Sequence, residues 1–86
     1  MKPDFNKNFK KQYQKLKPAQ KKRFAQALEL FVASPSHPAL YNHPLSGKWQ
    51  GHRSISFGGD WRAHYKITGR DTVLFVAVGS HNQLYE

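Results

Sequence analysis

The spacing of the hydrophobic residues changes at residue 34, and this change constrains the fold more than any other feature of the chain. Before it, apolar residues recur every three or four positions, as on one face of a helix. Beyond it, they alternate or form short apolar runs bounded by glycines, as in strands joined by turns. The sequence therefore predicts an α+β fold in which an N-terminal helix hairpin packs on a small antiparallel β-sheet.

Two helices are expected before the change of spacing. The first apolar stripe consists of Phe5, Phe9, Tyr13 and Leu16. The second consists of Phe24, Ala27, Leu28, Phe31 and Val32. Pro18 lies between them and suits the first turn of the second helix, where a backbone N–H has no partner within the helix. The first part of the chain is therefore predicted to be a helix hairpin.

Three strands are expected after it, at 51–57, 60–67 and 72–78, with glycine-containing turns between them. The last of these contains TVLFVAV, which is apolar on both faces, so we expect it in the centre of the sheet with the helices covering one side. Residues 2–4 could add a short edge strand. The C-terminal GSHNQLYE is expected to leave the sheet as a short tail.

The strand expected at 60–67 raises the functional question, because alternation divides its side chains between two faces. The face predicted to join the core consists of Trp61, Ala63, Tyr65 and Ile67. The face predicted to be wet consists of Asp60, Arg62, His64 and Lys66. The second set combines an acid, a fixed cation and an imidazole. It is either an ordinary solvated surface or the working surface of an enzyme.

Composition limits the class of protein. The 86 residues fit one domain, expected to span residues 1–86, and the absence of cysteine excludes disulfides, thiolate nucleophiles and Cys-ligated zinc. With no signal peptide and no long apolar run, we expect a soluble, cytoplasmic protein without membrane contact. The net charge of +9 favours nucleic acid as a partner, ahead of an acidic protein or an anionic membrane surface, and charge kept for solubility is the alternative.

Five histidines and the basic charge suggest what chemistry is open to the chain. No histidine spacing suits a metal site, and Gly58-Gly59 lacks the Lys-Ser/Thr of a phosphate-binding loop, so we expect neither a metal nor another cofactor. Metal-free acid–base chemistry remains. RNA cleavage by the 2′-hydroxyl of the strand itself needs a base, an acid and cations around the phosphate. Histidine and arginine supply all of these near neutral pH.

The whole chain resembles the RelE/ParE superfamily of bacterial type II toxins, and most closely its YafQ-like and RelE/StbE-type messenger-RNA interferases. The likeness rests on HPL at 43–45, Gly51 to Arg53, GDWR at 59–62 and the terminal Gly-Ser-His-x-x-Leu-Tyr. It implies a fold like that of microbial RNases. It also implies a ribosome-dependent endoribonuclease that cuts messenger RNA in the A site through 2′-hydroxyl attack, without a metal, and so inhibits translation.

The resemblance also implies partners and roles. A monomeric toxin would form a hetero-oligomer with an acidic antitoxin and contact 16S ribosomal RNA through its basic helices. At matching positions, His43 would contact the scissile phosphate, Asp60 would be the candidate general base, and His81 the candidate general acid. Arg62 matches a phosphate clamp, and Tyr85 matches a final aromatic that positions a base or phosphate. The further expected RNA contacts are Arg53, Lys48, Trp61, Lys10 and Lys11.

Departures from the family pattern keep alternatives open. Ser56 stands where the YafQ-like pattern has a histidine, and Arg62 belongs to the RelE branch, so the division of labour among base, acid and clamp is not assigned. Asp60 and Arg62 could also form a simple surface ion pair. His52 and His64 are interpreted as structural. The alternatives to a nuclease are a ParE-like toxin that inhibits DNA gyrase by binding, and an inactive member that binds only its antitoxin or RNA.

Overall fold

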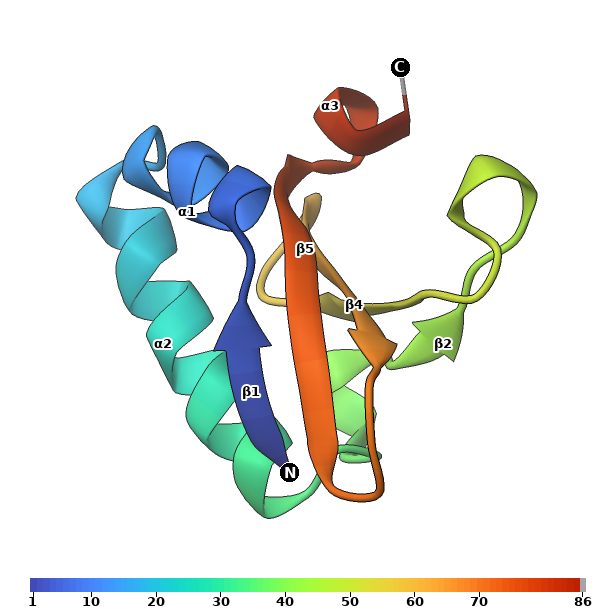
Figure 1. The fold of residues 1–86 in the computed structure, drawn as a ribbon. Helices are drawn as coiled ribbons and strands as arrows, with labels where there is room; N and C mark the ends of the chain where they lie inside the picture. Colours follow the sequence, from blue (N-terminus) through green and yellow to red (C-terminus); the bar gives the residue numbers. More distant parts are fainter. Residues whose placement is uncertain (86) are drawn as a thin grey trace.

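The computed structural model describes residues 1–85 and confirms the α+β class (Figure 1). The strands are β1 (Lys2–Phe5), β2 (His43–Pro44), β3 (Arg53–Ser56), β4 (Trp61–Ile67) and β5 (Thr72–Ser80). The helices are α1 (Lys7–Gln14), α2 (Pro18–Ala33) and α3 (His81–Tyr85), with short 3-10 turns η1 (Pro38–Leu40) and η2 (Gly47–Trp49). The strand order is β1-β5-β4-β3-β2, with β1 parallel to β5 and the other pairs antiparallel.

The helix hairpin is confirmed, but its first helix begins later than predicted. Phe5 is the last residue of β1 and pairs with Phe75 of β5, so the expected edge strand is present. Asn6 then caps α1, because its side-chain oxygen accepts a hydrogen bond from the backbone N–H of Phe9 at 2.8 Å. Pro18 opens α2 as expected. The apolar spacing therefore placed both helices, whereas the strand at the N-terminus shortened the first of them.

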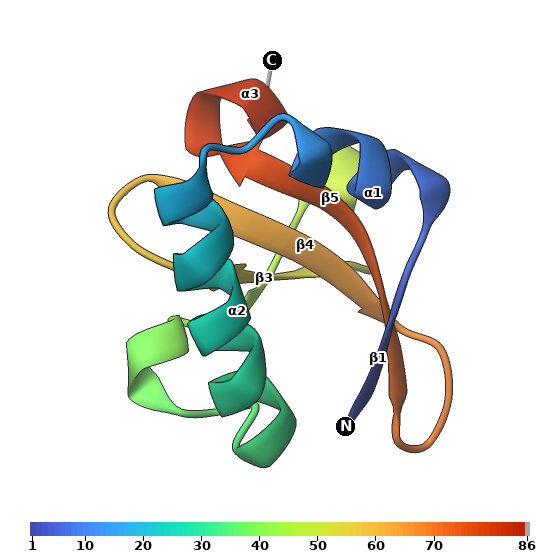
Figure 2. The same cartoon turned by 90° about the vertical axis from the view of Figure 1, so that its left-hand side faces the viewer.

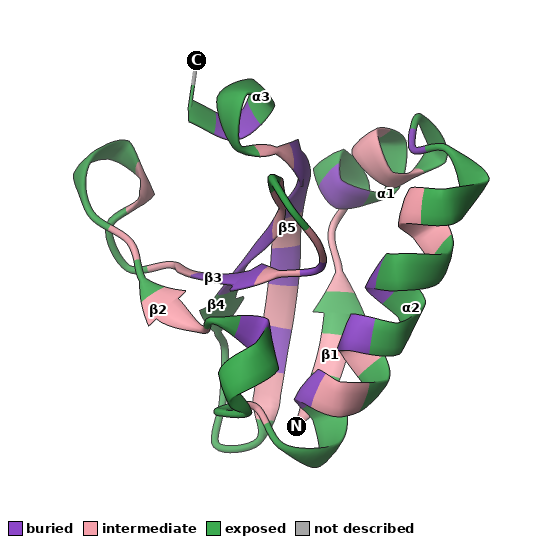
Figure 3. Ribbon diagram, turned by 180° about the vertical axis from the view of Figure 1, so that it is seen from behind, coloured by how far each residue is buried: buried purple, intermediate pink, exposed green. Residues whose placement is uncertain are grey.

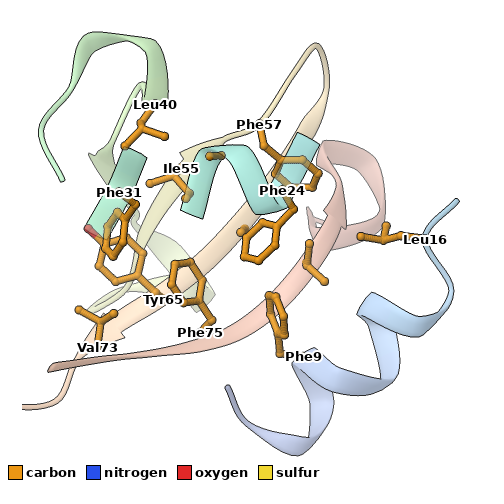
Figure 4. Packing of buried hydrophobic residues seen from close by; sticks show 13 residues of the cluster. Phe9, Leu16, Phe24, Phe31, Leu40, Ile55, Phe57, Tyr65, Val73 and Phe75 are labelled. Carbon is orange, nitrogen blue, oxygen red and sulfur yellow. The ribbon is translucent and has the colours of Figure 1, made fainter. Parts of the chain in front are cut away.

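Aromatic rings fill the space between the helices and one face of the sheet (Figure 4). Phe75 of β5 is completely buried and lies 5.8 Å from Phe24 and 5.5 Å from Phe31, both in α2, between ring centroids. Phe9 brings α1 to the same cluster, 5.9 Å from Phe75. Ring pairs of this kind contribute about 0.5–1.5 kcal/mol each beyond their buried area. Figure 2 shows α1 and α2 on this side, which leaves the opposite face of the sheet without them.

Burial along β4 follows the predicted alternation only in part (Figure 3). Ala63 and Tyr65 are buried under the helices as predicted, but Ile67 is 58% exposed, because it is the last residue of the strand beside the turn to β5. The prediction of a wet opposite face is wrong at His64, whose side chain is 0% exposed. Another part of the chain therefore covers the centre of that face.

The two segments nearest that face were not fully predicted. The segment between the helices and β3 contains the short strand β2, in which His43 pairs with Ser54. The expected tail is instead the one-turn helix α3. Its first turn is closed by a capping box, in which the Ser80 hydroxyl accepts from the Gln83 backbone N–H at 3.2 Å and the Gln83 side chain accepts from the Ser80 N–H at 2.8 Å.

The turn between β3 and β4 is formed by Gly58 and Gly59, as predicted. Both have positive φ angles, +123° and +51°, which glycine adopts without steric cost. Within residues 1–85, no helix is long and apolar enough to cross a membrane.

Candidate active site

The candidate site lies on the distal face, the face of the sheet turned away from α1 and α2. Neighbouring strands place His43, Ser54, His64 and Ala77 side by side in one row across this face. The next row consists of Ser56, Arg62 and Gly79. Strand pairing therefore brings residues from β2, β3, β4 and β5 to the same surface.

An aromatic cluster covers the centre of the distal face and consists of Trp49, His64 and Tyr85. The ring centroid of His64 lies 4.5 Å from that of Trp49 and 5.4 Å from that of Tyr85, with edge-to-face angles of 83° and 63°. The Trp49 indole N–H also donates a hydrogen bond to the Leu84 carbonyl at 3.1 Å. The cluster therefore joins the η2 segment to α3 over β4.

Helix α3 brings His81 to this cluster. His81 and Tyr85 stand one helical turn apart, and their ring centroids are separated by 4.5 Å. The backbone N–H of His81 donates to the carbonyl of Asp60 at 2.8 Å, which ties the start of α3 to the turn before β4. A side chain at Gly79 would put its Cβ 2.8 Å from the Gln83 side-chain oxygen, so glycine leaves room for the side chain that caps α3.

Arg62 is held in one orientation by hydrogen bonds from a single guanidinium nitrogen. Its Nη1 donates to the Ser56 hydroxyl at 3.1 Å and to the carbonyls of Gly59 and Trp61 at 2.8 and 3.0 Å. Among residues 1–85, its Nε and Nη2 make no hydrogen bond, and no ion pair joins it to Asp60. The possible surface ion pair is therefore not formed, and two nitrogens remain for an anionic oxygen.

His43 has a fixed tautomer. Its Nδ1 lies 2.9 Å from the Tyr41 carbonyl, which can only accept, so Nδ1 carries the proton and donates it. In the neutral ring, Nε2 then holds a lone pair. Tyr41 has a left-handed backbone, with φ of +46°, at the bend that leads from η1 toward β2. The local chain therefore prepares one ring nitrogen of His43 to accept a proton.

Burial and nearby charges determine the protonation state of the His64 ring. The pKa of His64 is lowered from 6.5 to about 4, mainly by burial and to a smaller extent by the nearby His52, His43, Arg62 and His81. Burial also raises the pKa of the Tyr85 phenol, while Arg62 opposes that shift. His64 is therefore a neutral imidazole near pH 7, whereas Arg62 acts on both His64 and Tyr85.

The structure brings together four of the five residues expected to be catalytic. His43, Arg62, His81 and Tyr85 lie around the aromatic cluster on or beside the distal face. Asp60 is joined to His81 through the backbone, and its side chain is exposed at the turn.

The expected RNA contacts are dispersed. Arg53 pairs with Tyr65 on the helix side and donates from Nε to the Asn42 side chain at 2.9 Å. Trp61 is half-buried on that same side, beside the core. Lys10 and Lys11 are exposed on α1, and Lys48 is exposed in η2, next to Trp49. Of these residues, only Lys48 comes from a segment that borders the distal face.

Residues 1–85 contain no group of three or more His, Asp or Glu side chains arranged to hold a metal ion. The arrangement instead offers imidazoles with an arginine and a phenol. Such groups can accept and donate protons beside a phosphate while a cation balances its charge.

Comparison with known proteins places the chain in a family. A model of the bacterial toxin of type II toxin–antitoxin systems named YafQ matches residues 1–86. The chain belongs to the YafQ family. The predicted resemblance to RelE/ParE-type toxins is thereby confirmed, and the protein is a type II toxin. The comparison with curated protein sequences gave no match.

Solved structures of YafQ-type toxins have the same fold. YafQ from E. coli strain BL21(DE3) is 23% identical, with 98% of this chain and 97% of that chain covered and a TM-score of 0.77. The E. coli DinJ–YafQ toxin–antitoxin complex gives 24% identity, 98% and 96% coverage and a TM-score of 0.74. A YoeB/ParE toxin from Agrobacterium tumefaciens gives 16% identity, 94% and 99% coverage and a TM-score of 0.76.

Two features of this YafQ-family site were not identified from the sequence. Trp49 organises the aromatic cluster, although its position in a loop gave no periodic signal. The Ser80-x-x-Gln83 capping box was visible in the sequence as a helix start, yet the segment was interpreted as a tail. Ser56 also has an explanation, because its hydroxyl orients Arg62 where the YafQ-like pattern has a histidine.

Proposed function

We propose that this toxin is a ribosome-dependent endoribonuclease that cuts messenger RNA in the A site with its own side chains. The observation that carries the proposal is the gathering of His43, Arg62, His81 and Tyr85 around one face of the sheet. These residues come from β2, β4 and α3, so they meet only in the folded chain. Membership of the YafQ family supports the same conclusion.

In the proposed reaction, the 2′-oxygen of the RNA bonds to phosphorus while the bond from phosphorus to the 5′-oxygen breaks. A base takes the proton of the 2′-hydroxyl, and His81 gives a proton to the leaving 5′-oxygen. The free nitrogens of Arg62 stabilise the charge that develops on the phosphate, and Tyr85 positions the group beside His81. The products are a 2′,3′-cyclic phosphate and a 5′-hydroxyl.

Two residues can serve as the base. His43 has a lone pair on Nε2 because its Nδ1 donates to Tyr41, whereas Asp60 carries a carboxylate close to the start of α3. The conservative variants His43→Gln and Asp60→Asn distinguish them, because each removes one proton acceptor and nearly keeps the size of the side chain. Loss of cleavage in His43→Gln with retained cleavage in Asp60→Asn would assign the base to His43. The opposite pair of results would assign it to Asp60.

The chemical step can be tested with an RNA that lacks the nucleophile. A message with a 2′-deoxynucleotide on the 5′ side of the cut should resist cleavage, and the normal message should give a cyclic phosphate end. Cleavage of the deoxy substrate, or a 3′-hydroxyl end on the product, would contradict the mechanism. A deoxy substitution several nucleotides away is the control, because it leaves the reacting hydroxyl in place.

We further propose that an acidic antitoxin binds this toxin and that the basic helices contact 16S ribosomal RNA. Solved structures contain the E. coli toxin YafQ bound to DinJ, which supports an antitoxin partner for this family member. The net charge of +9 favours an acidic partner segment and also favours RNA. Free toxin is expected to be monomeric in the cytoplasm, where ribosomes are available.

A further inference from the structure

His64 is a polar residue whose surroundings do not satisfy it. The side chain is 0% exposed, and neither ring nitrogen has a hydrogen-bond partner among residues 1–85. The hydroxyl of Ser54, its neighbour across the β3–β4 pair, is also buried without a partner. Buried polar groups without partners cost free energy of folding and are uncommon in proteins. His64 must therefore stabilise this part of the fold through its ring contacts rather than through hydrogen bonds.

That packing joins two segments with no strand pairing between them. His64 presents edge-to-face contacts to Trp49 of η2 and to Tyr85 of α3, at centroid distances of 4.5 and 5.4 Å. The Trp49 indole closes the connection through its hydrogen bond to the Leu84 carbonyl. Movement of the His64 ring would therefore disturb both segments, including the helix that carries His81.

The charges around His64 oppose a proton on the ring. Its neighbours on β3 and β5, Ser54 and Ala77, are neutral. The titratable and charged groups of the elements around it are His43, Lys48, His52, Arg62, His81 and Tyr85. Aromatic rings next to His64 could in principle favour a positive charge on it, because aromatic faces attract cations. A charged His64 would nevertheless have two buried N–H groups without acceptors, and it would lie in the electric field of Arg62 and the neighbouring histidines.

We propose that neutral His64 is a positioning residue that fixes Trp49 and Tyr85, and through them holds α3 and His81 in place. Its effect on cleavage rests on the proposed nuclease function, whereas its effect on the aromatic cluster does not. A protonated ring is destabilised in this position by its unpaired N–H groups and by the neighbouring positive charges. Acid therefore loosens the cluster and releases α3 from the sheet.

Exchange of the Trp49 indole proton tests the structural part by NMR. The rate is compared with that of free tryptophan at the same pH. In the wild type we expect strong protection at pH 7 and a loss of about tenfold per pH unit as the pH falls from 6 to 5, because opening is linked to proton uptake by His64. His64→Phe should keep its protection over this range. His64→Ala should have lost protection already at pH 7.

The matched control is His37→Phe, since His37 is exposed beside η1 and lies outside the cluster. This variant should keep the acid dependence of the wild type. An equal loss of protection with pH in the wild type and His64→Phe would overturn the proposal. So would protection in His64→Ala that equals the wild type. The comparison of the wild type with His64→Phe decides the matter even if His64→Ala does not fold.

Cleavage by the same variants tests the catalytic consequence. We expect His64→Ala to lower kcat more than it raises KM, because the disturbed helix carries His81 rather than the main RNA-binding charge. His64→Phe should rescue kcat. Wild-type kcat in His64→Ala would contradict the positioning role. If the proposed nuclease function is wrong, the wild type will not cut either, and the indole exchange still decides whether His64 fixes the cluster.

Discussion

The proposed mechanism gives single residues at the distal face distinct chemical tasks, and His81, the proposed acid, has the most direct one. It is exposed, it stands at the start of α3, and it contacts Tyr85. Arg62 is oriented by Ser56 and two carbonyls, so its remaining nitrogens are fixed before a phosphate arrives. Such preorganised cations stabilise developing charge without reorganisation during the reaction. In the proposed mechanism, the acid and the phosphate clamp are therefore separate residues.

We expect His81→Ala to reduce the cleavage rate by about 10²–10⁴, the contribution typical of a positioned acid or base. Single-turnover cleavage of messenger RNA on ribosomes measures this effect. The backbone N–H that bonds to Asp60 is retained, so the fold should not change. His37→Ala is the control, because His37 is exposed outside the site. A rate equal to that of the wild type would remove His81 as the acid.

His64 should make the stability of the toxin sensitive to acid. Its folded-state pKa is lowered from 6.5 to about 4, so below pH 6.5 the unfolded chain binds a proton that the folded chain does not. Stability is therefore complete above pH 6.5 and is lost as the pH falls to about 4. Each pKa unit corresponds to 1.36 kcal/mol, which gives a loss of about 3 kcal/mol at most.

Urea denaturation between pH 7 and pH 4 measures this dependence. His64→Phe should remove most of the loss of stability between pH 7 and pH 4 that this residue causes, whereas His37→Phe should leave that loss unchanged. Both variants keep every other ionisable group near the distal face, so the difference between the two variants is the informative quantity. Identical curves for His64→Phe and the wild type would show that His64 does not titrate as described.

At the scale of elements, the site depends on whether α3 and the η2 segment stay against the sheet. Helix α3 has five residues, too few to be stable by itself. Its capping box, the Asp60 carbonyl and the Trp49 indole hold it in place. The position of His81 therefore depends on a small number of specific hydrogen bonds.

Ser80→Ala should loosen α3 and reduce cleavage with little effect on the core. Loss of the Ser80 hydroxyl leaves the Gln83 N–H without its partner, at a cost of about 1 kcal/mol for a helix cap. Hydrogen exchange of the α3 amides, alongside the cleavage rate, measures the effect. Ser80→Thr keeps a hydroxyl and should behave like the wild type. Equal exchange in Ser80→Ala and the wild type would show that the cap does not hold the helix.

The sequence was sufficient to predict the helices and strands whose hydrophobic residues have a strong periodicity. Both helices, the three central strands and the Gly58-Gly59 turn follow from residue spacing and turn chemistry. The burial of His64 could not be predicted in this way, because it results from Trp49 and Tyr85 folding over the strand from two distant segments. Alternation reports which face a side chain takes. It does not report what covers that face.

Prediction of the candidate site had the same limit, because residue type does not determine where the fold places a side chain. His43, Arg62 and His81 were identified by type and by resemblance, and the fold brings them to one region. Arg53 was expected there too, but register places it opposite Tyr65 on the helix side. A one-residue difference in position along a strand changes the face, and the sequence of β3 alone does not decide its register.

At the scale of the whole molecule, the proposed function uses two opposite sides. The candidate site occupies the distal face, whereas Lys10 and Lys11 are exposed on α1, which packs on the opposite face. A toxin inserted into the ribosome would therefore present its site to the messenger RNA while its helices contact ribosomal RNA. An antitoxin that covers either side would interfere with this placement.

Binding to ribosomes should weaken steeply with salt. Removal of one lysine that neutralises a phosphate should reduce the slope of log affinity against log salt by about one, so Lys10→Gln and Lys11→Gln should each flatten it by that amount. Arg70→Gln is the control, because Arg70 is exposed in the turn between β4 and β5, away from α1. A slope unchanged in both lysine variants would show that α1 does not contact RNA.

The central claim is that this toxin cuts messenger RNA in the ribosomal A site, and mapping of cut ends in a translating extract tests it most directly. Wild-type toxin should give cuts within the A-site codon of stalled ribosomes, and none on the same RNA without ribosomes. His81→Ala should reduce the cuts on ribosomes by about 100-fold or more. Intact transcripts with wild-type toxin, together with growth arrest and a DNA-damage response in cells, would contradict the claim and favour a gyrase inhibitor.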